Sequence, residues 1–200
     1  MASTRRMGPE NSASRLAMLD ATERVLQEDG YAALSSRRVA EEAGLKQQLV
    51  YYYFRTMDDL ILATFQRRTE RALQRLEKTL ESDEPLHGLW ELSSHPANAR
   101  LSIEFMALAN RNEAIRAEVI RYQERSRAMQ EELLGRLLEA AGVDIKIFPP
   151  VAAAMLLACV AQLLDRETAL GAARGHEELK GLVAWCLQRL EPAGTSAPSH

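Results

Sequence analysis

Cationic side chains gather in one short stretch of this 200-residue sequence: Arg37, Arg38, Lys46 and Arg55. Residues 1–56 hold eight basic and seven acidic side chains, whereas the whole chain has a formal net charge of -3. Guanidinium and ammonium groups bind phosphate oxygens well, and a slightly basic segment beside a larger acidic one suits a polyanionic partner. The charge distribution therefore indicates a polyanion-binding segment near the N-terminus.

Other kinds of chemistry find little support in the sequence. Cys159 and Cys186 match neither a disulfide framework nor a metal-ligand spacing, so we expect buried thiols. None of the histidines has a second His or Cys three or four residues away; they are His87, His95, His176 and His200. No motif combines a nucleophile with a base, or two carboxylates. The sequence therefore predicts no metal site, no cofactor and no enzymatic activity.

The elements that must position the cationic side chains are helices. Glycine and proline are few, at 10 and 7, while residues that favour helices are abundant. Apolar side chains recur at helical spacing in nine segments, which predicts an all-α fold of about nine helices. The segments are 14–29, 35–43, 46–53, 57–80, 85–92, 100–110, 115–141, one that begins at 149 or 150, and 177–190.

The second and third segments form a helix-turn-helix candidate. Ser35 can cap the start of the second segment, and Gly44 ends it. The third segment follows at once, so two short helices are joined by a tight turn. We expect a small core beneath them, made of Val39, Leu45, Val50, Tyr53 and Phe54.

From Leu34 to Leu60 the chain reads LSSRRVAEEAGLKQQLVYYYFRTMDDL, and here it resembles the TetR family of transcriptional regulators. The matching features are a first helix that ends in Gly-Tyr, a hydroxyl cap, the Val-Ala and Ala-Gly pairs, an aromatic run that ends in Phe, and a Leu that opens the fourth helix. The resemblance covers about a quarter of the chain. It implies an N-terminal three-helix DNA-binding domain, followed by a larger helical domain that binds an effector and dimerises.

The resemblance also assigns candidate DNA contacts. Lys46, Gln47 and Gln48 stand at the start of the recognition helix, where side chains reach base edges in the major groove. Glutamine can pair with adenine through two hydrogen bonds, and lysine can reach guanine acceptors. The remaining candidates are expected mainly at phosphates; they are Ser35, Ser36, Arg37, Tyr51, Tyr52 and Arg55.

Two positions depart from the family pattern. Met57 stands where a lysine usually contacts phosphate, and Arg55 is the candidate replacement for that contact. Arg38 occupies a position where an acidic residue is common. Both departures affect which phosphates are bound rather than the fold.

An effector pocket is implied for the larger domain, and it should be mostly apolar. Its candidate residues combine large apolar side chains with polar groups that lie among apolar neighbours. They are Phe65, Trp90, Glu104, Phe105, Met106, Tyr122, Ser126, Met129, Met155 and Gln162. Ordinary core packing is the alternative for each, and Glu104 has Arg100 one turn away as an alternative partner.

The last two helices indicate self-association. From 151 to 164 every residue except Gln162 is apolar, so a helix there has no solvent face. We therefore expect a homodimer formed through residues 150–190. The predicted organisation is a DNA-binding domain at 1–56, an effector and dimerisation domain at 57–190, and a disordered tail at 191–200.

The predicted function is a cytoplasmic, ligand-responsive repressor that binds a palindromic double-stranded DNA operator. A small, mostly apolar effector would release it, and no membrane association is expected because the longest apolar run is far shorter than the roughly 20 residues of a bilayer span. The alternative is a helical protein-interaction or ligand-binding module without DNA binding. Met57 and the acidic overall charge favour this alternative, whereas Arg37, Lys46, Arg55 and the tyrosines oppose it.

Overall fold

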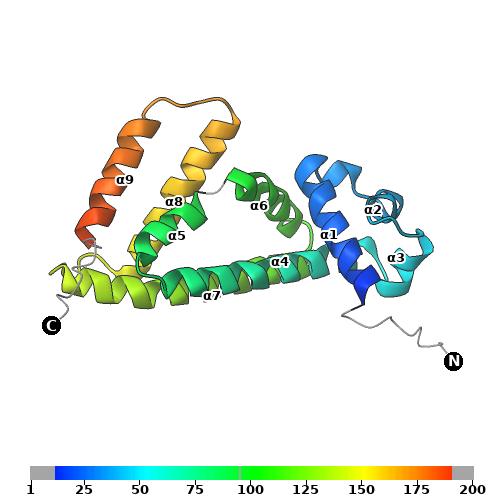
Figure 1. Ribbon diagram of the computed structural model, residues 1–200, viewed down its shortest axis with the longest axis horizontal. Helices are drawn as coiled ribbons and strands as arrows, with labels where there is room; N and C mark the ends of the chain where they lie inside the picture. The colour runs from blue at the N-terminus through cyan, green and yellow to red at the C-terminus, as the bar shows by residue number, and fades with distance from the viewer. Residues whose placement is uncertain (1–11, 95, 191–200) are drawn as a thin grey trace, which may run out of the picture. The chain divides into compact units, whose positions relative to one another are not determined.

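The computed structural model describes residues 12–94 and 96–190, with side chains throughout except at 96–100. Within these ranges the chain forms nine α-helices and no strand, as the all-α prediction requires (Figure 1). The helices are α1 (Ala13–Glu28), α2 (Ser36–Glu42), α3 (Gln48–Tyr53), α4 (Met57–Leu80), α5 (Pro85–Ser93), α6 (Pro96–Ala109), α7 (Glu113–Ala140), α8 (Pro150–Ala169) and α9 (His176–Leu190). The predicted tail at 191–200 lies outside the described residues.

The helix ends agree with the predicted ones to within a few residues, with two instructive differences. The α-helical part of α3 begins at Gln48, because the amides of Leu49 and Val50 bond to carbonyls only three residues back, those of Lys46 and Gln47. Lys46 and Gln47 therefore lie in a tight lead-in turn. Helix α6 begins at Pro96 rather than at Arg100, since proline fits the first turn of a helix.

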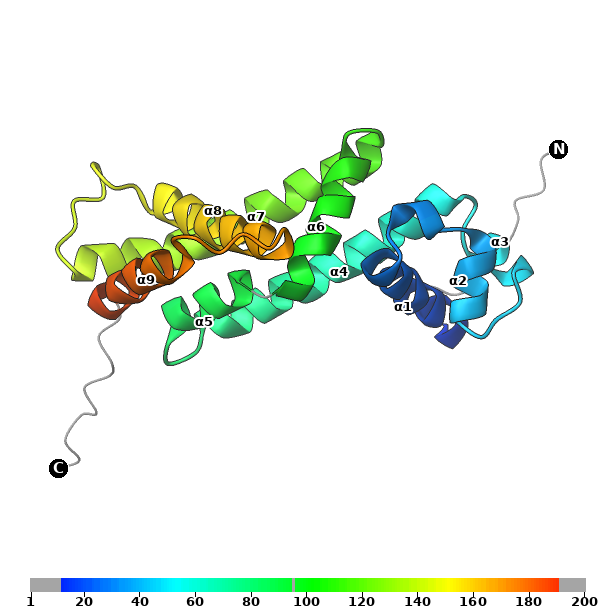
Figure 2. The ribbon, with the colours of Figure 1, turned by 90° about the horizontal axis from the view of Figure 1, so that it is seen from above.

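The chain divides into two compact units, and the first consists of residues 1–70 together with 100–120. One apolar cluster of this unit joins α1, α2, α3 and the start of α4, as Figure 2 shows for the helices. Its buried members include Leu19, Val39, Val50, Phe54 and Leu60. The core expected beneath the helix-turn-helix is thus confirmed.

A second apolar cluster of the first unit joins the end of α1, the first turns of α4, and α6 with the start of α7. Two of its buried members are Phe65 and Phe105, whose ring centroids lie 4.2 Å apart. Beside the clusters, Arg67 pairs with Asp20 at 2.9 Å and Arg68 with Glu23 at 2.7 Å. These ion pairs join the middle of α4 to the middle of α1.

The second unit consists of residues 71–99 and 121–200. Its core is formed by α5, α7, α8 and α9, with Leu86, Leu134, Ala154 and Leu187 among the buried side chains. Helix α5 lies close to the end of α4 because Gly88 carries no side chain: a Cβ there would stand 2.7 Å from a methyl group of Thr79.

Helices α8 and α9 lie side by side (Figures 1 and 2). Both helices carry large apolar side chains that are exposed to solvent. Leu156, Leu182 and Trp185 are each more than half exposed, and Met155 is 44% exposed. Together with Cys159 and Cys186 these residues are called the α8–α9 apolar face. The expectation of buried thiols is wrong for the isolated chain, because both cysteines belong to this face.

No helix in the described part of the chain combines the length and the apolar character that crossing a bilayer requires.

Candidate nucleic-acid interface

The helix-turn-helix is built from local signals that the sequence carries. The Ser35 hydroxyl accepts a hydrogen bond from the backbone amide of Arg38 at 3.2 Å, which caps α2. The turn after α2 contains Gly44 with φ +65°, and the amide of Leu45 closes it by bonding to the carbonyl of Ala40 at 2.9 Å. Glycine adopts this left-handed conformation without strain. The turn therefore fixes the angle at which α3 leaves α2.

The start of α3 is open to solvent. Lys46, Gln47 and Gln48 are exposed, and so are Tyr51 and Tyr52, at 43% and 42%. Val50 and Tyr53 point the other way, into the core of the first unit. This division of faces leaves polar and aromatic groups together on the outer side of α3, which is the arrangement that a groove-binding helix needs.

Two of these side chains are hydrogen-bonded to α2. The Gln47 Nε2 donates to the Ser36 Oγ at 2.9 Å, and the Tyr51 hydroxyl donates to the same oxygen at 3.1 Å. Ser36 itself is only 7% exposed. All three residues are predicted DNA contacts, but this triad has no sequence signal, since its bonds span 11 and 15 residues.

The outer side of α2 carries the two arginines. Arg37 is paired with Glu41 at 2.8 Å, and 79% of its side chain is exposed. The hydrogen bond and charge of Glu41 hold the pKa of Arg37 above its usual value. Arg38 pairs with Glu42 at 2.8 Å and with Asp29 at 3.1 Å, and these hydrogen bonds likewise raise its pKa.

The pair at Glu42 belongs to a small network that joins α1 to α2. Arg24 donates to Glu42 at 2.8 Å, and together with the bond from Arg38 this lowers the pKa of the Glu42 carboxyl. Arg38, which departs from the family pattern, thus has a structural role in this protein. Arg37 lies outside the network and faces solvent.

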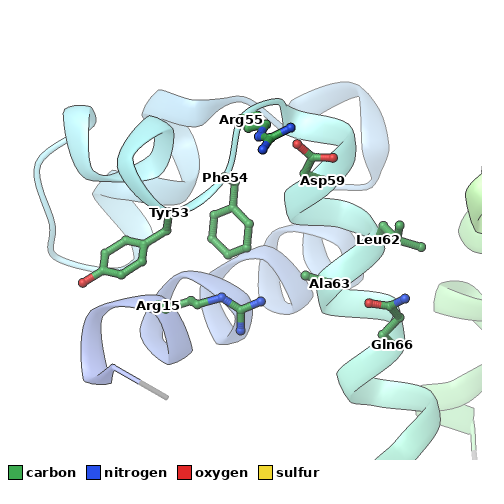
Figure 3. Close-up of a pocket in the computed structure, with 8 residues that line it drawn as sticks. All are labelled: Arg15, Tyr53, Phe54, Arg55, Asp59, Leu62, Ala63 and Gln66. Carbon is green, nitrogen blue, oxygen red and sulfur yellow. The ribbon is translucent and has the colours of Figure 1, made fainter. Parts of the chain in front are cut away.

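Arg55 and Met57 differ in exposure. Arg55 is exposed between α3 and α4, whereas Met57 is half-buried and packs on the core of the helix-turn-helix. Arg55 also lines an open cavity of about 290 Å³ with Arg15, whose guanidinium lies 5.1 Å from the ring centre of Phe54 (Figure 3). The position of Arg55 is compatible with the phosphate contact that Met57 cannot make.

None of the ten predicted effector residues lines that cavity. Phe65, Glu104, Phe105 and Met106 belong to the first unit; Phe65 and Phe105 are buried, Glu104 is half-buried and Met106 is exposed. The other six belong to the second unit. Of these, Trp90, Tyr122, Ser126 and Met129 are half-buried, while Met155 and Gln162 are exposed.

A buried acid that is not among the predicted site residues lies in the first unit. Glu118 is 5% exposed and accepts a hydrogen bond from the Thr69 hydroxyl at 2.9 Å. Nothing in the surrounding sequence distinguishes Glu118 from the solvent-facing acids of α7. Its partner lies 49 residues earlier in the chain, on α4.

Comparison with known proteins finds a family model that matches the helix-turn-helix and the helices beside it. Residues 18–64 match the family model described as "Bacterial regulatory proteins, tetR family". The chain is 28% identical over 127 residues to the HTH-type transcriptional regulator CymR of Pseudomonas putida, and 25% identical over 64 residues to the fatty acid metabolism regulator protein of Bacillus subtilis (strain 168). These alignments cover 60% and 32% of this chain, and 63% and 33% of the curated relatives.

Solved structures match over nearly the full length. A TetR transcription regulator from Haloarcula marismortui superposes with a TM-score of 0.71 and 23% identity, over 89% of this chain and 96% of that one. The regulator FadR from Bacillus subtilis, in complex with stearoyl-CoA, superposes with a TM-score of 0.64 and 15% identity, over 90% and 98%. At these identities the likeness establishes the fold.

Proposed function

We propose, from the premise that this chain is a TetR family transcriptional regulator, that it represses transcription by occluding a promoter at a palindromic operator. One observation carries the proposal: the side chains at the start of α3 are exposed, on a helix-turn-helix with its own core. They are Lys46, Gln47 and Gln48. A two-fold dimer, or a pair of dimers, would present one such helix to each half-site.

The DNA contacts divide into two kinds. Lys46, Gln47 and Gln48 are assigned to base edges, and Arg37, Tyr52 and Arg55 to phosphates. Tyr51 donates its only hydroxyl proton to Ser36, so a phosphate contact there would require exchange of that bond.

The proposed organisation follows the predicted domains. Residues 1–56 bind DNA, and residues 57–190 bind the effector and dimerise. The α8–α9 apolar face supports dimerisation, because several large apolar groups are exposed on two helices that share one core, and exposed apolar patches mark association surfaces. We assign it to an isologous contact with a second copy.

The proposed effector is small and mostly apolar. Its candidate contacts are the predicted effector residues, which lie on helices α4 to α8. The stearoyl-CoA complex of the Bacillus subtilis FadR is compatible with such a ligand in this fold. Helix α4 has residues in both compact units, so it is the element assigned to carry the change to the DNA-binding domain. The effector releases DNA by binding the DNA-incompetent arrangement more tightly.

Selection of bound DNA from a random-sequence pool tests the proposal. The expected result is a palindromic consensus, with sedimentation showing dimers or pairs of dimers on it. Gln48→Ala should relax preference at particular positions, whereas Arg37→Ala should weaken all sequences together. Selection of no consensus, with only monomers at micromolar concentration, would favour the alternative of a helical module without DNA binding.

A further inference from the structure

Gln47 is held in one orientation before it meets any ligand. Its exposed side chain would otherwise be free to rotate, but its Nε2 is bonded to the Ser36 Oγ at 2.9 Å. Ser36 is the first residue of α2 and is buried, so its oxygen is a fixed anchor. The loss of side-chain freedom is therefore incurred during folding rather than during binding.

The Ser36 oxygen has no lone pair left for a further hydrogen-bond donor. A serine oxygen has two lone pairs, and here it accepts one bond from Gln47 and one from Tyr51. A glutamine amide has a second N–H and a carbonyl oxygen. When the N–H that bonds Ser36 is the one trans to the carbonyl oxygen, the second N–H lies beside that oxygen. Gln47 therefore keeps one adjacent donor and acceptor for a ligand.

Adenine is the base that such a pair recognises. In the major groove it presents the N7 acceptor beside the N6 amino donor, which matches the N–H and C=O of an amide. Guanine presents two acceptors there, and cytosine presents a donor without the neighbouring acceptor. An amide held at its Nε2 by Ser36 keeps its carbonyl oxygen and one N–H for these two bonds.

We propose that Ser36 determines base specificity without contacting a base: it holds the Gln47 amide so that Gln47 reads an adenine at one position of each half-site. This inference rests on the proposed operator binding. It changes the expected role of Ser36 from a direct DNA contact to a positioning residue for Gln47.

The test measures relative affinities for every single-base variant of the selected operator at one fixed salt concentration. Wild type should prefer adenine at one position by about 5- to 150-fold, and Gln47→Ala should abolish that preference. Ser36→Ala should reduce the preference about fivefold at that position, the effect expected from one hydrogen bond. In the Gln47→Ala background, Ser36→Ala should cause no further change there.

A matched pair of variants separates positioning from packing. Ser36→Thr keeps the hydroxyl, whereas Ser36→Val introduces a side chain of the same shape as threonine but without a hydroxyl. Only the threonine variant should therefore retain the adenine preference. Ser102→Ala on the exposed face of α6 is the neutral control. Thermal melting confirms that each variant is folded, and the threonine and valine variants carry the test if alanine unfolds the domain.

The outcomes distinguish the inference from the function on which it rests. If wild type selects no operator, the proposed function fails. If Gln47→Ala changes one position but the threonine and valine variants have the same base ranking as wild type, Ser36 only packs α2 against α3 and the inference is overturned. A uniform loss of affinity for all sequences in the valine variant would lead to the same rejection.

Discussion

Replacement of Leu182 by serine should weaken dimerisation about 15- to 250-fold. Leu182 lies on the α8–α9 apolar face and is 56% exposed in the isolated chain. Complete burial of a leucine contributes about 1.5–3 kcal/mol, so covering the exposed part contributes about 0.8–1.7 kcal/mol. A two-fold dimer contains the residue twice, which gives about 1.7–3.4 kcal/mol, and each 1.4 kcal/mol changes the Kd tenfold.

Sedimentation equilibrium over a range of protein concentrations measures the Kd directly. The matched control is Leu170→Ser, since Leu170 is 79% exposed at the C-terminal cap of α8, beyond the α8–α9 apolar face. The control should leave the Kd within a factor of about two, because isolated exposed leucines contribute little. Equal weakening by both variants, or an unchanged Kd in Leu182→Ser, would refute the assignment of this face to dimerisation.

Four further substitutions test the fold, each by chemical denaturation. Arg68→Met should lower the free energy of unfolding by about 1.5–3 kcal/mol, because it removes a charged hydrogen bond to Glu23 that is largely shielded from water; a loss below about 0.5 kcal/mol would contradict this. Glu42→Gln should be less stable than wild type at pH 7. The pKa of Glu42 is lowered in the folded state, so the difference should disappear as the pH falls through that pKa, and a pH-independent difference would contradict this. Gly88→Ala should destabilise by about 1 kcal/mol through overpacking. Gly181 lies in open space on α9, so Gly181→Ala should stabilise the protein by about 0.5–1 kcal/mol. Stability changes of the same sign for the two glycine variants would contradict this reasoning.

The helices could be predicted because their ends are set by neighbouring residues. Ser35 caps α2 from one position before it, and Gly44 supplies the left-handed turn just after it. The prolines at 85 and 150 each begin a helix. All of these signals act over a few residues, so the sequence displays them directly.

The details of the site could not be predicted, because they depend on contacts between distant residues. The Ser36 bonds to Gln47 and Tyr51 require the angle between α2 and α3. The burial of Glu118 requires the position of α4 beside α7. Helical periodicity indicates which side of a helix is apolar, but it does not indicate which polar groups on two helices will meet.

The arginines of α2 show how one short helix can serve both folding and binding. Arg38 holds two carboxylates, Asp29 and Glu42, and thereby links α2 to the end of α1. Arg37 holds only Glu41, on the surface, where such a pair contributes little to stability. Exchanging Glu41 for a DNA phosphate therefore costs little at Arg37, whereas the same exchange at Arg38 would disrupt the α1–α2 network. The structure thus favours Arg37 over Arg38 for the backbone contact.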